Sequence, residues 1–170
     1  MMIFEETQRF RQPWLWLMMV ILVVVEIGPF GSGLYRQLVW RHTFDINPAS
    51  DRAFIWTSIA VFLVLGAVIW LLLAAYLRVE VRDDALFVRF FPFIRGRVIP
   101  YSEIRACAAR RYSPIAEYGG WGVRFGRNGK AYNVSGNRGV QLELVSGERL
   151  LLGSQHADEM AAAIARNRHE

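Results

Sequence analysis

The first half of the chain contains two long apolar runs, and the second half alternates short apolar and polar segments. The longer run, 53–77, carries no charge and no proline. A helix rises about 1.5 Å per residue, so this run is long enough to cross a hydrocarbon core of about 30 Å. The shorter run, 14–25, crosses only if its helix continues through Glu26. We therefore expect two antiparallel transmembrane helices, 14–34 and 53–77, joined by a loop over 35–52.

Local signals agree with these helix starts. Pro13 suits the first turn of the first helix, and Asn47 followed by Pro48 suits an N-cap with a first-turn proline. A cleaved signal peptide is the alternative for the first run. It is disfavoured because Glu26 ends the apolar core and no small-x-small cleavage motif follows.

The distribution of arginine predicts the orientation in the membrane. The N-terminal flank and the twenty residues after the second run hold seven arginines, whereas the intervening loop holds three. Positive residues are retained on the cytoplasmic side. Two crossings then place both termini in the cytoplasm, and we expect a multi-pass membrane protein. In that reducing compartment the lone Cys107 is expected to be a free thiol.

Beyond residue 77 the pattern predicts a mainly-β (α+β) domain. Asp83-Asp84 marks one turn, and Asn128-Gly129 is a strong hairpin signal. An alanine-rich segment, 155–166, ends the chain as a helix with early acids and late arginines. We expect about seven antiparallel strands in a sandwich or barrel, capped by this helix, from the candidate segments 77–82, 85–91, 97–101, 103–112, 121–127, 130–134, 140–145 and 149–152.

Several of these segments resemble a known family. IPYSEIRACAARRYSP, YGGWGVRF and AYNVSGNRGVQLELVSGERLLLGS, with the alanine-rich helix after them, are similar to bacterial pleckstrin-homology-like domains. The whole chain resembles uncharacterised bacterial membrane proteins with two helices before such a domain. The change of pattern at Arg78 divides the chain into a membrane segment, 1–77, and a cytoplasmic domain, 78–170. The resemblance implies that the membrane is the inner membrane of a bacterium. It implies a fold and no particular activity.

One turn departs from the lipid-binding relatives of this fold. Eukaryotic pleckstrin-homology domains hold phosphoinositide headgroups with a basic first hairpin turn. The corresponding turn here contains Asp83 and Asp84. Two carboxylates repel a phosphate, so we do not expect phosphoinositide binding by that route.

Composition and charge narrow the function. Of the 170 residues 54% are apolar, the net charge is +5 and there is one cysteine, which excludes a disordered chain and a disulfide-stapled scaffold. The excess positive charge lies in 78–170, with 15 basic and 10 acidic groups. Anionic headgroups would attract arginines close to a membrane helix, and we single out Arg78, Arg82, Arg89, Arg95 and Arg97.

Glu26 is the main candidate within the membrane. An unpaired carboxylate in lipid is costly, so it should be protonated, paired or placed at an interface. By depth, Thr57 and Ser58 of the second helix are its expected partners. The alternatives are a proton or ion site, or a first helix that ends early and leaves Glu26 at the interface.

Other chemistry has little support in the sequence. The histidines His42, His156 and His169 lack metal-ligand spacing, and Cys107 has no histidine nearby in the chain. The glycines over 119–139 follow neither the Walker phosphate-loop pattern nor the dinucleotide-binding pattern, and they are typical of turns. We expect no enzyme activity, no cofactor or metal, and no nucleic-acid partner. The leading hypothesis is a membrane-anchored binding or scaffolding module with a protein partner, a lipid surface or its own copies as ligand. The alternative is a transport or pore subunit built around Glu26.

Overall fold

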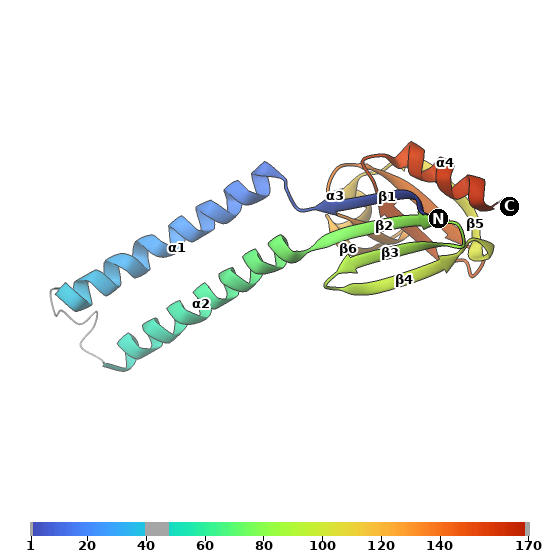
Figure 1. Cartoon of the computed structure of the whole chain (residues 1–170). Coiled ribbons are helices and arrows are strands. Elements are labelled where there is room, and N and C mark those ends of the chain that lie inside the picture. Colours follow the sequence, from blue (N-terminus) through green and yellow to red (C-terminus); the bar gives the residue numbers. More distant parts are fainter. Residues whose placement is uncertain (1, 40–47, 169–170) are drawn as a thin grey trace. The chain divides into compact units, whose positions relative to one another are not determined.

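A computed structural model describes residues 2–39 and 48–168, and the chain divides into two compact units. One unit comprises residues 11–73 and is helical. The other combines residues 2–10 with residues 74–168 and is rich in β-structure. The protein is thus an α+β protein, and each unit is described by itself (Figure 1).

The helical unit consists of α1 (Pro13–Val39) and α2 (Pro48–Ala74). Each contains a stretch long and apolar enough to cross a membrane, Pro13–Gly33 and Ile55–Ala74. Almost none of the most apolar window in either stretch is buried, which is unlike the core helix of a soluble protein.

The helix boundaries differ from the expected ones at three ends. Both helices begin at a proline, as the first-turn signals predicted. However, α1 continues past residue 34, and α2 takes in residues 48–52 of the expected loop. The helix α2 ends at Ala74 because the alternation that follows commits Tyr76 onward to a strand. The rest of the expected loop, with Asn47, lies outside the described residues.

The first sheet has four antiparallel strands in the order β1-β2-β3-β4. Three of them correspond to expected strands. The first strand was not expected, and it assigns residues 2–9 to the β-rich unit instead of the membrane segment. The strands are β1 (Met2–Arg9), β2 (Tyr76–Arg82), β3 (Ala85–Phe91) and β4 (Ile94–Pro100).

The second sheet has five strands in the order β5-β8-β9-β7-β6. The fully antiparallel expectation is wrong for one pair, since β7 and β9 run parallel. The cause is the return of β9 from β8 into the place between β8 and β7. The strands are β5 (Ile104–Arg111), β6 (Gly122–Gly126), β7 (Gly129–Asn133), β8 (Arg138–Leu144) and β9 (Arg149–Gly153).

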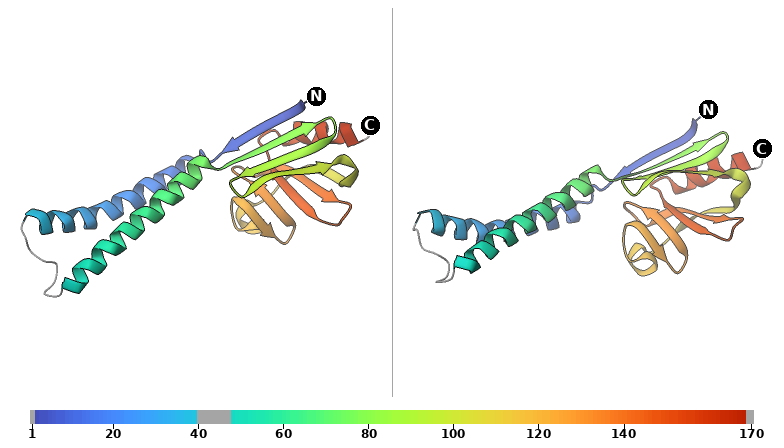
Figure 2. Two further views of the ribbon diagram at one scale, coloured as in Figure 1. Left: turned by 60° about the horizontal axis from the view of Figure 1, so that its bottom comes forward. Right: turned by 90° about the horizontal axis from the view of Figure 1, so that it is seen from below.

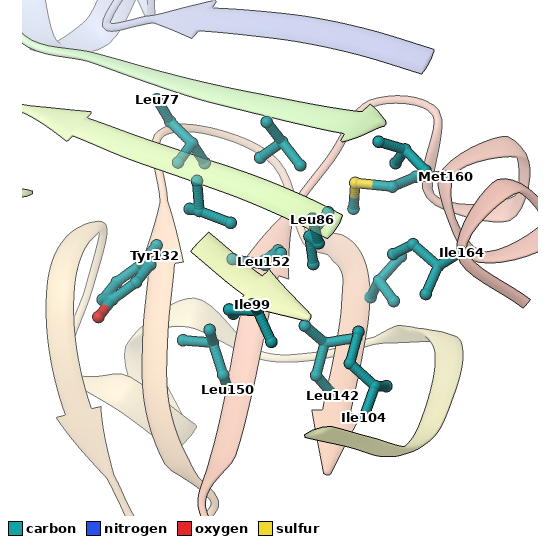
Figure 3. Close-up of a cluster of buried hydrophobic side chains, with 14 of the residues drawn as sticks. Leu77, Leu86, Ile99, Ile104, Tyr132, Leu142, Leu150, Leu152, Met160 and Ile164 are labelled. Carbon is teal, nitrogen blue, oxygen red and sulfur yellow. The ribbon is translucent and has the colours of Figure 1, made fainter. Parts of the chain in front are cut away.

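The two sheets enclose one core, which the C-terminal helix α4 (Ala157–Arg168) helps to close (Figures 2 and 3). Leu77, Val79 and Val81 alternate with polar residues along β2 and point into this core. From α4, Met160 and Ile164 are fully buried against it. The predicted C-terminal helix is therefore confirmed. Two short elements complete the unit, the 3₁₀ turn η1 (Tyr101–Glu103) and the helix α3 (Pro114–Tyr118).

Candidate functional site

The outer face of the four-stranded sheet carries three of the arginines that the sequence singled out. Leu77, Val79 and Val81 face the core, so the alternate residues of β2 face outward. Arg78 and Arg82 are among these, and Arg89 of β3 pairs directly with Arg78 in the antiparallel register. The sheet thus gathers charges that are scattered in the sequence.

Acidic neighbours satisfy two of these arginines. Arg78 forms ion pairs with Glu5 at 2.9 Å and with Glu80. Arg82 also pairs with Glu80 and lies 4.7 Å from the centre of the Phe87 ring. The Glu80 residue is only 5% exposed, so two guanidinium groups balance a nearly buried carboxylate. Arg78 and Arg82 are therefore held in ion pairs within the sheet, and their contact with lipid stays a prediction.

Arg97 has a structural role on the opposite side of its sheet. Its two terminal nitrogens donate to both carboxylate oxygens of Glu148, at 2.8 and 2.9 Å. Lys130 approaches the same carboxylate at 3.1 Å. The hydrogen bonds from Arg97 lower the pKa of Glu148 to about 2, and this pairing raises the pKa of Arg97 above its usual value. Arg97 thus links β4 to the turn between β8 and β9.

Arg89 is held by aromatic rings instead of acids. Its guanidinium carbon lies 5.8 Å from the centre of the Tyr76 ring and 5.9 Å from that of Phe91. Those two rings stack on each other at 5.7 Å. Its buried Nε has no hydrogen-bond partner within the described part of the chain. The positive charge of Arg89 is therefore positioned by the sheet but not neutralised by an ion pair that the structure shows.

A second arginine joins this group from the N-terminal strand. Arg9 pairs with Tyr76 in the register of β1 and β2, and its guanidinium lies 5.7 Å from the centre of the same ring. We call Arg9, Tyr76, Arg89 and Phe91 the arginine–aromatic cluster. Cation–π contacts of this kind contribute about 0.5–1 kcal/mol each at exposed sites.

The cluster lies close in sequence to both helices. Tyr76 is the second residue after the end of α2, and Arg9 lies four residues before the start of α1. A fully extended chain spans at most about 3.6 Å per residue. Where a helix does cross a membrane, arginine and tyrosine so near its end are typical of the headgroup region.

Sequence reasoning therefore identified only part of this cluster. It found Arg89, but it counted Arg9 only as a topology signal because the strand β1 was not expected. The alternation over residues 3–9 is masked by the polar run EETQR. Arg95 is exposed on β4 and stays a candidate for lipid contact.

In the helical unit, Glu26 belongs to a half-buried stripe of α1. The stripe also contains Met19, Val23, Phe30 and Gly33, at the three- and four-residue spacing of one helix face. Phe30 contacts Phe62 of α2, with the ring centres 5.8 Å apart. Glu26 therefore lies on the same side of α1 as this contact.

The contact between the two rings also sets the levels of the helices. In antiparallel helices matched at Phe30 and Phe62, Glu26 lies level with Gly66, where an added Cβ would meet open space. Thr57 and Ser58 lie about two turns farther towards the loop, because α1 continues well beyond its expected end. The hydroxyl of Thr57 donates to the carbonyl of Ala53 in its own helix, at 2.7 Å. This register therefore does not place Thr57 or Ser58 level with Glu26, as the expected contact would require.

The turn that the sequence analysis took for the first hairpin turn is acidic, but it follows the second strand, because the unexpected strand β1 pairs with β2 ahead of it. Asp83 and Asp84 connect β2 to β3 and are exposed. Burial raises the pKa of the nearby Tyr101 to about 12, and the negative charges of Asp84 and Asp83 add to this rise. The hydroxyl of Tyr101 donates to the carbonyl of Arg82 at the start of this turn. The two carboxylates would repel a phosphate at this turn.

Nothing in the described ranges, 2–39 and 48–168, gathers three or more side chains suited to a metal ion. Cys107 is half-buried on β5, and its thiol lies 3.9 Å from the carbonyl of Ala161 on α4. Burial raises the pKa of this thiol, which disfavours the reactive thiolate.

No protein-family model, curated protein or solved structure matches the chain. The resemblance to bacterial pleckstrin-homology-like domains therefore stays a prediction.

Proposed function

We propose that this protein is a non-enzymatic, membrane-anchored binding module of a bacterial inner membrane. In this proposal α1 and α2 cross the bilayer, and the β-rich unit is a pleckstrin-homology-like domain in the cytoplasm. Two packed sheets and a C-terminal helix that closes their core support the fold assignment. The length and apolar character of both helices support the anchoring.

The ligand that we propose for this module is the anionic membrane surface. The observation that carries this proposal is the arginine–aromatic cluster, with Arg9 and Arg89 stacked on Tyr76 within a few residues of both helix ends. An arginine near an anionic surface contributes about 1 kcal/mol. The rings stabilise each charge without neutralising it, so both arginines can bind lipid phosphates.

Lipid retention by the full-length protein tests this function. The chain is purified in a neutral detergent, titrated with phosphatidylglycerol or phosphatidylcholine, and analysed by native mass spectrometry. We expect a preference for phosphatidylglycerol that falls roughly fivefold with R9Q or R89Q, since about 1.4 kcal/mol corresponds to a factor of ten. The matched control is R127Q, which removes an equal charge from an exposed turn of the same unit. Equal retention of both lipids, or an equal loss in R127Q, would contradict the proposal.

A further inference from the structure

The two sheets of the β-rich unit have four and five strands. The core side of the five-stranded sheet is not covered along its end strand, β6. Val123 and Phe125 of β6 pair with Tyr132 and Lys130 of β7. Paired residues point to the same face of a sheet, and Tyr132 is buried in the core. Val123 and Phe125 therefore face the core side. Val123 is half-buried against the core, yet Phe125 is 73% exposed. The core side of the second sheet is uncovered at this point.

A shallow hollow of about 420 Å³ lies beside Phe125. Its walls are Phe125, Lys130, Glu148 and Arg149, and three glycines contribute only backbone. Gly129 is required there, because a Cβ would lie 2.2 Å from the carbonyl oxygen of Arg149. At Gly147 an added Cβ would meet open space, so this side of the hollow is open to a side chain from another molecule.

The charge around the hollow favours an acidic ligand. The residues that line or flank it include four cations, Arg97, Arg127, Lys130 and Arg149, and two carboxylates, Glu143 and Glu148. Arg97 and Lys130 share the single carboxylate of Glu148, and Arg127 is exposed in the β6–β7 turn. Additional carboxylates would balance this excess of positive charge.

The strand β4 supplies a backbone template next to the hollow. It is the last strand of its sheet, with β3 on one side and no strand on the other within the described residues. Its Arg97 bonds to Glu148 in the wall of the hollow, so β4 lies beside it. An end strand with free backbone groups accepts an extended peptide as an additional strand.

We propose that β4 and the uncovered face of β6 bind an acidic, extended segment of a partner protein. The segment adds a fifth strand to the four-stranded sheet. One of its apolar side chains covers Phe125, and its carboxylates meet Lys130 and Arg127. This surface is separate from the arginine–aromatic cluster, so the inference does not rest on the proposed lipid contact.

Selection from a phage-displayed library of random dodecapeptides tests the inference. The target is the full-length chain in nanodiscs of phosphatidylcholine alone, which removes anionic lipid as a competitor. We expect enriched peptides with an excess of aspartate and glutamate around an apolar residue. The affinity of such a peptide, measured by fluorescence anisotropy, should fall at least tenfold with F125S or with K130E. The matched control is I115S, since Ile115 is an exposed apolar residue like Phe125, with 68% of its surface accessible, but lies on α3.

The location of binding is tested by hydrogen exchange, in which the bound peptide should protect backbone amides of β4. The inference is overturned if no peptide is enriched, if the enriched peptides are not acidic, or if F125S and I115S weaken binding equally. Because Phe125 is exposed, F125S should fold normally, and K130E provides a second variant that depends on charge alone.

Discussion

Arg9 and Tyr76 are paired neighbours in one β-hairpin, although the entire helical unit lies between them in the sequence. The strand β1 leads into α1, and α2 leads directly into β2. The helices are thus an insertion into the β1–β2 hairpin.

The β-rich unit should fold without the helices provided that β1 is retained. If Phe10 is joined to Ala74 by a short glycine–serine linker, the resulting chain should be a soluble monomer that unfolds cooperatively. The strand β1 covers the edge of β2, and its Glu6 accepts hydrogen bonds from Ser154 and from the backbone of Gln155. The fragment 74–170, which lacks β1, should be less stable by several kcal/mol. Urea unfolding followed by circular dichroism would compare the two, and equal midpoints would contradict this role for β1.

The ion pair between Arg97 and Glu148 should make stability depend on acid. The folded-state pKa of Glu148 is about 2, below its ordinary value. The ionised Glu148 therefore contributes its full stabilisation of the folded state above about pH 4.5, and this stabilisation is lost as the pH falls towards 2. E148Q should lower the melting temperature at pH 7 and flatten its decrease between pH 5 and 3. E143Q is the control, because the Arg149–Glu143 pair is largely exposed and worth under about 1 kcal/mol. Identical pH profiles of E148Q and E143Q would refute this assignment.

Two glycines with similar backbone conformations should respond differently to alanine. Gly129 has a φ of +96° and Gly147 a φ of +85°. An added Cβ meets the Arg149 carbonyl at 2.2 Å at the first position and open space at the second. G147A should cost about 1–2 kcal/mol of backbone strain, and G129A clearly more. Chemical denaturation of both variants measures the difference, and equal losses would show that the close approach at Gly129 is not decisive.

Replacement of Glu26 separates the binding module from the transport alternative. Glu26 lies in the same stripe of α1 as Phe30, at the level of Gly66 of α2. A neutral glutamine of the same shape should leave the helices and the β-rich unit unchanged. We expect proteoliposomes of the original chain and of E26Q to show the same background proton permeability. A proton flux in the original chain that E26Q abolishes would favour the transport function.

The local elements were predictable because their signals are local. Alternation located most strands of the β-rich unit, and the turn at Asp83-Asp84 and the hairpin at Gly129 followed from turn chemistry. The strand β1 was not predicted because a single strand before a helix has no neighbour in sequence to pair with. The parallel pairing of β7 with β9 depends on a long-range return that periodicity does not encode.

The same contrast holds for the candidate site. The sequence identified arginines after the second helix but could not tell which of them have acidic partners. Only the sheet register reveals that Glu5 and Glu80 satisfy Arg78. It also reveals that Arg9 reaches Tyr76 beside Arg89. Likewise, the end of α1 at Val39 could not be predicted from its apolar run, which stops well before that residue.

Topology is the most direct test of the central claim that two helices anchor this unit at a bacterial inner membrane. Single cysteines are introduced in a C107A background, S50C near the start of α2 and S146C in the turn between β8 and β9. Intact spheroplasts and lysed membranes are then treated with a membrane-impermeant maleimide. The account predicts that S50C is labelled from outside and S146C only after lysis, with the chain in the membrane pellet. Equal labelling of both sites in intact spheroplasts, or recovery of the chain in the soluble fraction, would contradict it.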